Sequence, residues 1–192
     1  DIIRECVDAF NIPQIEIEGF EADDIIATYC KLAENQKTES IIVSSDKDLM
    51  QLVTKDVTML DPMKNKKVGI NQVIEKFGLP PEKVIQIQAL TGDKVDNIPG
   101  APGIGPKTAL QLIEEFGDVH NLIKNANKIP QEKRRNVIID HKEDILLSLK
   151  LVKLKNDIEL PLNISEIHTY SSVDKNENLS KFLSNQGFKS IA

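Results

Sequence analysis

Seven carboxylates in the first half of the chain fall into three short motifs whose spacing could serve metal chemistry. They are Glu21, Asp23, Asp24, Asp46, Asp48, Asp93 and Asp96. If these side chains converged on one site, they would repel one another unless cations lay between them. Oxygen ligands without His or Cys favour Mg²⁺ or Mn²⁺ over zinc. Two such ions are a common arrangement for phosphodiester hydrolysis, which then needs no Ser, Cys or His nucleophile.

Each motif taken alone also has a purely structural interpretation. The first lies where a helix should begin, and acidic residues are favoured in the first turn of a helix. Asp46 could cap the helix that follows it, and the segment around Asp93 and Asp96 is rich in turn-forming residues. The functional interpretation therefore requires the three motifs to meet. Asp46 and Asp48 directly follow a predicted buried strand, and sites in parallel α/β sheets form at such strand ends.

The segment 98–109, IPGAPGIGPKTA, is the most specific in the chain. Its glycines permit left-handed turns, and Pro106 is suited to open a helix whose free N–H groups could bind phosphate. It is not a P-loop, because Pro106 stands between Gly105 and Lys107, and no strand leads into it as a dinucleotide site requires. An ordinary αα-corner is the alternative to a helix-hairpin-helix that grips phosphates without reading sequence. The residues expected to contact DNA are Gly100, Gly103, Ile104, Gly105, Lys107 and Thr108.

Charge is unevenly distributed along the chain. The net charge of −6 by itself argues against nucleic acid as a partner. Residues 1–63 contain 14 Asp or Glu and 5 Lys or Arg, whereas residues 124–155 contain 4 and 9. An acidic first part and a basic later part suit a metal-dependent enzyme that acts on a polyanion. Chance clustering of charges is the alternative.

The elements that must position these motifs alternate between strand and helix over the first 70 residues, which predicts an α/β sheet. The strand SIIVSS is nearly all apolar, so we expect it to be buried on both faces. The expected strands are 14–18, 40–45, 57–60 and 66–70, and the expected helices are 1–10, 21–33 and 47–52. Later signals are helical, with Asn71 as a cap and a polar linker at 171–177. Helices are expected at 71–77, 81–90, 106–116, 119–126, 131–139, 141–151 and 179–186, with a returning strand at 157–162.

Several classes of protein are disfavoured by composition. Cys6 and Cys30 are the only cysteines, and they form no CxxC, so a disulfide framework or a zinc site is not expected. No apolar run approaches the ~20 residues needed to span a bilayer, and no signal peptide opens the chain. We therefore expect no membrane contact and a cytoplasmic location.

Four motifs together resemble the 5′-nuclease family of DNA polymerase I, which is related to the flap endonucleases. They are EADD at 21–24, SDKDL followed by QL at 45–52, LTGD followed by DN at 90–97, and the hairpin at 98–109. Their order and spacing also agree with the family, and the similarity covers nearly the whole chain. Small departures are Lys94-Val95 between the paired aspartates and Ala101-Pro102 in the hairpin, and neither removes a ligand.

This resemblance implies a PIN-like three-layer α/β core at 1–75, an all-helical helix-hairpin-helix subdomain at 76–165, and a C-terminal helix and linker at 166–192. It implies that all seven carboxylates are metal ligands, directly or through water, with Asp23, Asp46 and Asp48 as the catalytic set. Two Mg²⁺ or Mn²⁺ ions would bind in the complete domain, and K⁺ could bind the hairpin carbonyls. The implied partner is DNA with 5′ flaps, nicks or primer ends, and the parent protein would be monomeric.

The family's domain begins before Asp1, so the resemblance also implies an incomplete core that lacks its first strand, further aspartates and a helical arch. The leading hypothesis is a fragment of a structure-specific 5′→3′ exonuclease and flap endonuclease of replication and repair. A second is a binding module that holds DNA without sequence preference and without catalysis. A third, a Mg²⁺ phosphatase for small molecules, leaves the hairpin and the basic stretch without a purpose.

Overall fold

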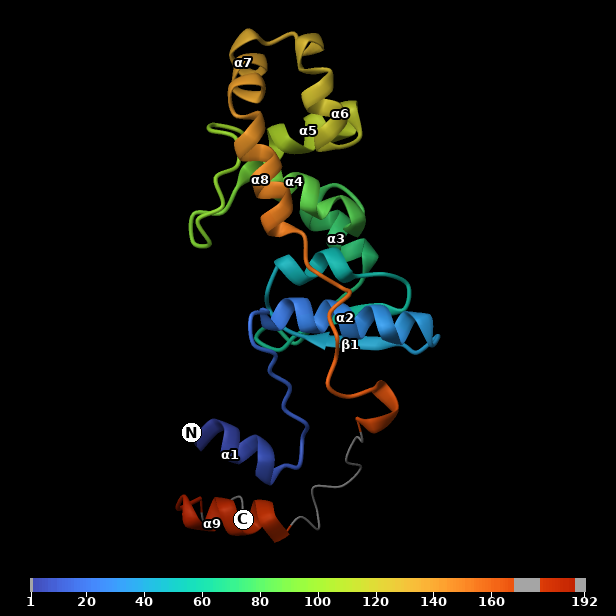
Figure 1. Ribbon diagram of the computed structural model, residues 1–192, viewed down its shortest axis with the longest axis vertical. Helices are drawn as coiled ribbons and strands as arrows, with labels where there is room; N and C mark the ends of the chain where they lie inside the picture. The colour runs from blue at the N-terminus through green and yellow to red at the C-terminus, as the bar shows by residue number, and fades with distance from the viewer. Residues whose placement is uncertain (1, 168–176, 189–192) are drawn as a thin grey trace.

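The computed structural model describes residues 2–167 and 177–188, which form two stacked parts (Figure 1). A small sheet with its helices lies in the middle of the long axis, and helices alone form one end. The expected order, an α/β part followed by an all-helical part, is confirmed. None of the described helices is long and apolar enough to cross a membrane.

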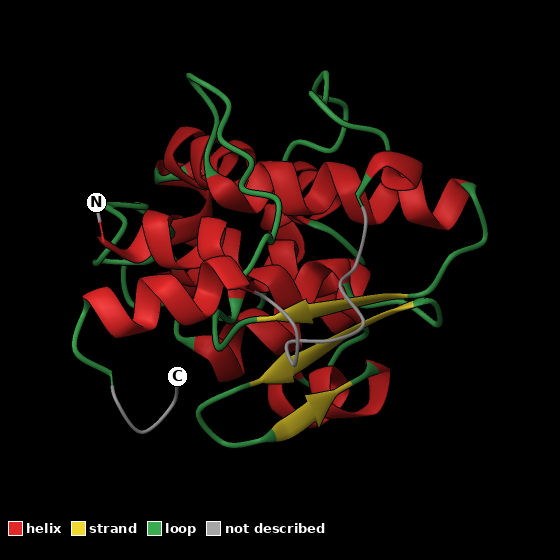
Figure 2. Ribbon diagram, turned by 90° about the horizontal axis from the view of Figure 1, so that it is seen from below, coloured by secondary structure: helices red, strands yellow, loops and turns green. Residues whose placement is uncertain are grey.

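The sheet has three strands in the order β1, β2, β3 (Figure 2). β1 (Ser40–Val43) runs parallel to β2 (Val57–Asp61), and β3 (Lys66–Val68) runs antiparallel to β2. Helix α2 (Ala22–Asn35) packs against β1. Ser40 pairs with Val57 in the parallel register, which directs the carboxyl ends of both strands toward the same edge.

The first strand departs from the expected burial on both faces. Ile42 is buried with Cys30 of α2 in one apolar cluster, but Ile41 and Val43 are 64% and 63% exposed. Successive side chains of a strand point to opposite faces of its sheet, so Ile41 and Val43 lie on the face opposite to the cluster that covers Ile42. The apolar sequence predicted the strand correctly, but it could not show that the described residues cover only one face of this strand.

Two expected strands, 14–18 and 157–162, are wrong, because neither segment forms a strand or joins the sheet. The Gln14 amide instead donates to the Arg4 carbonyl and the Asp8 carboxylate at the end of α1 (Ile2–Ala9). The Leu162 carbonyl accepts from the Tyr29 hydroxyl of α2 at 2.9 Å. Alternating apolar residues favour an extended backbone, but a strand also needs a neighbour for its hydrogen bonds.

Two helix starts also differ from expectation. The segment after β1 is a short 3₁₀ helix, η1 (Asp48–Leu52), and α3 (Ile70–Phe77) begins one residue early. Gly69, rather than Asn71, is the N-cap of α3, and its N–H donates to the Gln72 side chain at 2.9 Å. The third strand correspondingly ends at Val68.

The helical part begins with η2 (Pro81–Lys83) and α4 (Val84–Thr91), and its helices pack around α4 and α8. The others are α5 (Pro106–Phe116), α6 (Val119–Lys124), η3 (Ala126–Lys128), α7 (Glu132–Asp140) and α8 (Lys142–Val152). Their core is formed by fully buried aliphatic residues: Leu90, Leu112, Leu122, Ile138 and Ile145. Phe77 packs against both this core and the core of the sheet, so the two cores are in contact through its ring.

The chain after α8 runs back along the sheet part to η4 (Ile164–Glu166) and α9 (Glu177–Asn185). Helix α9 lies beside α1 at the far end of the molecule from α7 (Figure 1). The expected last helix is therefore confirmed, while most of the expected linker at 171–177 lies outside the described residues.

Candidate metal centre and nucleic-acid interface

The second acidic motif lies directly beyond the carboxyl end of β1. The parallel pairing continues for one residue, because the Ser44 N–H donates to the Leu60 carbonyl. The Asp46 N–H then donates to Ser44 Oγ at 3.0 Å, and Asp46 Oδ1 accepts from the Asp48 N–H at 2.9 Å. Asp46 therefore forms a turn just before η1, but it is not the expected cap, because Lys47 is the N-cap of η1 and no side chain caps this helix.

The first and second motifs meet. Burial, and after it the carboxylates of Asp46 and Asp48, together raise the pKa of Asp23 from its ordinary value near 3.8 to about 6. Burial also raises the pKa of Asp48, again with a contribution from Asp46. The start of α2 and the start of η1 therefore bring three carboxylates from two elements into one electrostatic neighbourhood. Glu21 and Asp24 add smaller repulsive contributions at Asp23.

Asp24, however, is engaged outside this group. Its Oδ1 accepts from the Lys155 N–H at 2.8 Å, which ties α2 to the chain that leaves α8. One oxygen of Asp24 therefore serves the tertiary structure. Sequence spacing placed Asp24 in the same motif as Asp23, but only the fold shows which residue it contacts.

Two glutamines hold Asp48 from both sides. Gln51 Nε2 donates to the Asp48 carbonyl and to the Val152 carbonyl, each at 2.9 Å, and its Oε1 accepts from the Leu154 N–H. Gln88 Nε2, from α4, donates to Asp48 Oδ1. Sequence reasoning placed Gln51 in a family motif without a role, and it missed Gln88. The available signal was a pair of glutamines, Gln86 and Gln88, in a helix whose other residues are mostly apolar.

The third motif forms a tight loop between α4 and the hairpin. Asp93 and Ile98 exchange two backbone hydrogen bonds of 3.0 and 2.7 Å, and Asp93 Oδ1 accepts from the Val95 N–H. Asp93 Oδ2 accepts from Lys47 Nζ at 2.5 Å, which lowers the pKa of Asp93 and raises that of Lys47. Asp96 is close enough to Asp48 to raise its pKa slightly. The third motif thus approaches the second, with Lys47 between them.

Within residues 2–167 and 177–188, no three His, Cys, Asp or Glu side chains meet in the geometry of a metal-ligand set. The three motifs approach one another, but their described side chains do not form a complete set of metal ligands. The donor chemistry nevertheless fits a hard divalent cation, because partly buried carboxylates that repel one another need positive charge and offer only oxygen. Asp23, Asp46 and Asp48 are the group that such an ion would stabilise most directly.

The glycine hairpin is built by close backbone contact. A Cβ on Gly100 would meet the Gly92 nitrogen at 2.4 Å, and Gly100 has a φ of +61°. Its N–H donates to the buried Ser148 hydroxyl of α8 at 2.9 Å. The Ala101 N–H donates to the Leu90 carbonyl at the end of α4. The hairpin is thus fixed to two helices through its main chain.

The tip of the hairpin is free to contact a ligand. A Cβ on Gly103 or Gly105 would meet nothing within 4 Å. Pro106 opens α5, and Gly105, its N-cap, supplies no side-chain acceptor for the first N–H groups of the helix. Lys107 is exposed beside that end. Ile104 is different, because its side chain is buried with 7% exposed, so only its main chain can take part in contacts.

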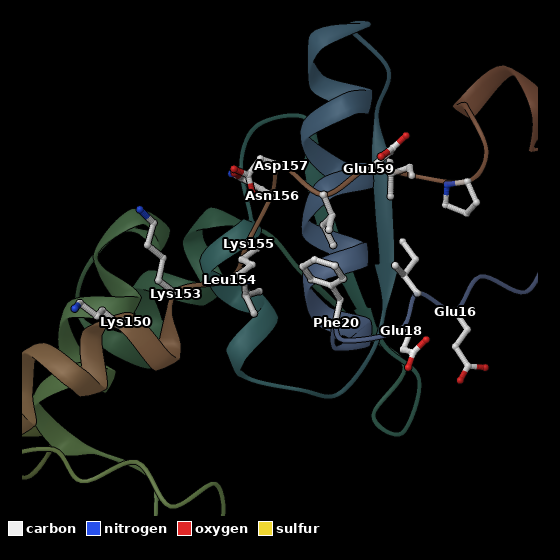
Figure 3. A pocket seen from close by; sticks show the side chains of 14 residues that line it. Glu16, Glu18, Phe20, Lys150, Lys153, Leu154, Lys155, Asn156, Asp157 and Glu159 are labelled. Carbon is white, nitrogen blue, oxygen red and sulfur yellow. The ribbon is translucent and has the colours of Figure 1, made fainter.

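A separate open groove of about 1190 Å³ lies between the end of α8 and the start of α2 (Figure 3). Lys150 and Lys153 line one side, while Glu16 and Glu18 line the other. Lys155 Nζ lies 4.9 Å from the centre of the Phe20 ring, a cation–π distance. The two signs of charge oppose each other across the groove, so it has no preference for an anion.

Family models match almost the whole chain. Residues 1–78 match the model described as 5′-3′ exonuclease, N-terminal resolvase-like domain, and residues 79–176 match 5′-3′ exonuclease, C-terminal SAM fold. A DNA polymerase I of Rhizobium leguminosarum is 56% identical over 166 residues, which are 86% of this chain and 16% of that protein. A 5′-3′ exonuclease of Aquifex aeolicus is 40% identical over 166 residues, covering 86% of this chain and 56% of that protein.

Solved structures with the same fold are nucleases. A 5′-exonuclease of T5 with bound divalent zinc ions superposes with a TM-score of 0.73 and 26% identity, over 93% of this chain and 63% of that one. A flap endonuclease of bacteriophage T5, in a pseudo-enzyme-product complex with DNA and metal ions, gives a TM-score of 0.64 and 28% identity. That match covers 71% of this chain and 50% of the phage protein.

Proposed function

Because the chain belongs to the 5′-3′ exonuclease family, we propose that it supplies a metal centre and a DNA-gripping hairpin for hydrolysis of phosphodiester bonds near 5′ ends. The observation that carries this proposal is that Asp23 is partly buried close to Asp46 and Asp48, and burial together with these two carboxylates raises its pKa to about 6. Partly buried carboxylates that repel one another are typical of sites that bind a cation.

Asp23, Asp46 and Asp48 would hold divalent ions, with Mg²⁺ or Mn²⁺ favoured by the all-oxygen donor set. Glu21, Asp24, Asp93 and Asp96 would contribute directly or through water. Two bound ions would supply an activated water and stabilise charge on the phosphate and the leaving oxygen. The chain's own residues fix the geometry, because Asp46 anchors the start of η1 and the two glutamines hold Asp48.

The hairpin would hold the phosphate backbone beside this centre. The positive end of α5, where Gly105 offers no side-chain cap, suits an anion, and Lys107 adds positive charge there. Gly103, Gly105 and Thr108 would form the rest of the contact, and K⁺ could bind the hairpin carbonyls. Gly100, which sequence reasoning placed in this contact, is buried with its N–H donating to Ser148, so it shapes the hairpin instead. Contacts to phosphate carry no sequence information, so recognition would follow the structure of DNA: a 5′ flap, a nick or a primer end. The proposed state is a cytoplasmic monomer.

A second candidate function is DNA binding without catalysis. The described residues form no closed set of metal ligands, and the chain spans only 16% and 56% of two of its relatives. The hairpin does not depend on the carboxylates, and it would still bind phosphates. A small-molecule phosphatase has less support, because it gives the hairpin no role.

Cleavage of a 5′-labelled flap duplex in Mg²⁺, with binding of the same DNA followed in parallel, separates these functions. We expect binding and metal-dependent cleavage. Replacing Asp46 and Asp48 together by Asn should lower the cleavage rate by about 100-fold or more, since charge stabilisers of the transition state are lost. DNA binding should persist in that variant.

The control is Asp140→Asn, which removes an exposed carboxylate of α7 and should leave cleavage unchanged. Full activity in the double variant would rule out the proposed centre. Binding without any metal-dependent cleavage by the unaltered chain would favour the second function.

A further inference from the structure

Gln88 is a buried polar residue that faces the proposed metal centre from a different part of the molecule. It lies on α4, is 9% exposed, and its Nε2 donates to Asp48 Oδ1 across 40 positions of sequence. It is therefore one of the contacts through which the helical part reaches a carboxylate of the sheet part, as the Lys155 N–H does at Asp24. The proposed function assigned it no role.

The orientation of the Gln88 amide is fixed by its neighbour. Reversing the amide would place Oε1 against Asp48 Oδ1, and two acceptors would then repel each other. In the observed orientation, Oε1 is buried and has no hydrogen-bond partner within the described residues. An unsatisfied buried acceptor costs about 1–3 kcal/mol. The Gln88 amide thus makes a hydrogen bond to Asp48 while its own carbonyl oxygen stays without one.

The other nearby glutamines are used differently. Gln51 is satisfied at both ends by main-chain groups, and Gln86 on the same helix accepts from the Val119 N–H at 2.9 Å. Both therefore connect elements of the fold. Gln88 differs because its partner is an ionisable carboxylate and it contributes little to the connection between main chains.

We infer that Gln88 is a positioning residue for Asp48. This inference rests on the proposed function, since it assigns Asp48 a metal. The amide holds Asp48 Oδ1, which fixes the rotamer of the carboxylate and directs Oδ2 away from α4. Hydrogen bonds of this kind to a ligating carboxylate set its direction before the ion arrives.

The space beside Gln88 supports the same role. A cavity of about 250 Å³ is lined by Gln88, Asp48, Asp93, Lys47 and Lys76. Gln88 and Asp48 therefore line the same cavity, which also reaches Asp93 of the third acidic motif. An apolar side chain of similar size would fill the place of Gln88 but could not hold Asp48.

The test compares Gln88→Met with Gln86→Met in the full chain, by Mn²⁺ titration followed by electron paramagnetic resonance and by thermal unfolding without metal. Loss of a supporting hydrogen bond typically weakens metal binding by about 10–100-fold. We expect Gln88→Met to show such a loss, with an unfolding temperature that is unchanged or higher because the unsatisfied Oε1 is gone. Gln86→Met should do the reverse, lowering the unfolding temperature while Mn²⁺ affinity stays the same.

Three results would overturn the inference, and they can be told apart. If the unaltered chain binds Mn²⁺ and Gln88→Met binds it equally well, Gln88 does not position Asp48, while the proposed function stands. If the unaltered chain binds no Mn²⁺, both fail together. A lower unfolding temperature in Gln88→Met with unchanged Mn²⁺ affinity would show that Gln88 has only a structural role.

Discussion

The sheet part and the helical part position their functional groups by different means. In the sheet part, Asp46 and Asp48 depend on side-chain hydrogen bonds, and the carboxylates around Asp23 repel one another. In the helical part, the hairpin is set by main-chain contacts between Gly92 and Gly100 and by the start of α5. The difference suggests that the metal centre responds to charge and to single side chains. The hairpin should respond mainly to the shape of its backbone.

The largest expected effect comes from a pair of glycine substitutions, which test whether main-chain contact defines the hairpin. Gly100→Ala should destabilise the helical part by about 3 kcal/mol or more, because its Cβ would meet the Gly92 nitrogen at 2.4 Å and φ is +61°. Gly103→Ala shares a positive φ, +76°, but meets nothing within 4 Å, so it should cost only about 1 kcal/mol. Urea unfolding measures both values. Equal losses would mean that backbone contact does not define the hairpin.

A second variant tests how the hairpin is fixed to α8. Ser148→Ala removes the hydroxyl that accepts from the Gly100 N–H, which leaves that buried donor unsatisfied. We expect a loss of about 1–3 kcal/mol in the free energy of unfolding. Ser184→Ala, in α9, is the control and should have almost no effect. A neutral Ser148→Ala would show that water or a shifted backbone replaces the hydroxyl.

The pH dependence of stability tests whether charge repulsion around Asp23 governs the sheet part. The pKa of Asp23 is raised to about 6, above the value near 3.9 of an unfolded chain. Its contribution to stability is therefore fully present below about pH 3.9 and is lost as the pH rises through about 6. Added Mg²⁺ should offset this loss, so it should raise the unfolding temperature more at pH 7.5 than at pH 5.

Asp23→Asn is the control for this titration. It removes the ionisable group, so the Mg²⁺ effect on the unfolding temperature should shrink and lose most of its dependence on pH. If Mg²⁺ stabilises the unaltered chain equally at both pH values, Asp23 does not take part in binding the ion.

The smallest expected effect concerns DNA affinity. Lys107→Ala removes an exposed charge beside the start of α5 and should weaken DNA binding several-fold at low salt. One phosphate contact fewer should reduce the slope of log affinity against log salt by about 0.9. Lys55→Ala, in the sheet part, should change neither quantity. An unaltered slope for Lys107→Ala, measured by fluorescence anisotropy, would place the phosphate contacts elsewhere.

The local features of this protein were predictable from sequence alone. The helix after Pro106, its stop at Gly117 and the strand before Asp46 depend on residues that are neighbours in the chain. The three acidic motifs and the hairpin were recognisable for the same reason, because each is defined by close spacing. The rival interpretation of Asp46 as a cap was wrong in its detail, because Lys47 is the N-cap of η1 and Asp46 instead accepts from the Asp48 N–H two residues on.

The tertiary structure decided which of these local features meet. It turned Asp24 toward Lys155, paired Asp93 with Lys47, buried the side chain of Ile104 and left Ile41 exposed. It also left 14–18 and 157–162 without strand partners and placed Gln88 against Asp48. Each of these outcomes depends on a partner that is distant in the sequence. The spacing of residues within a motif does not indicate which distant residue will contact it. Propensity determined the elements, whereas packing determined the contacts of the site.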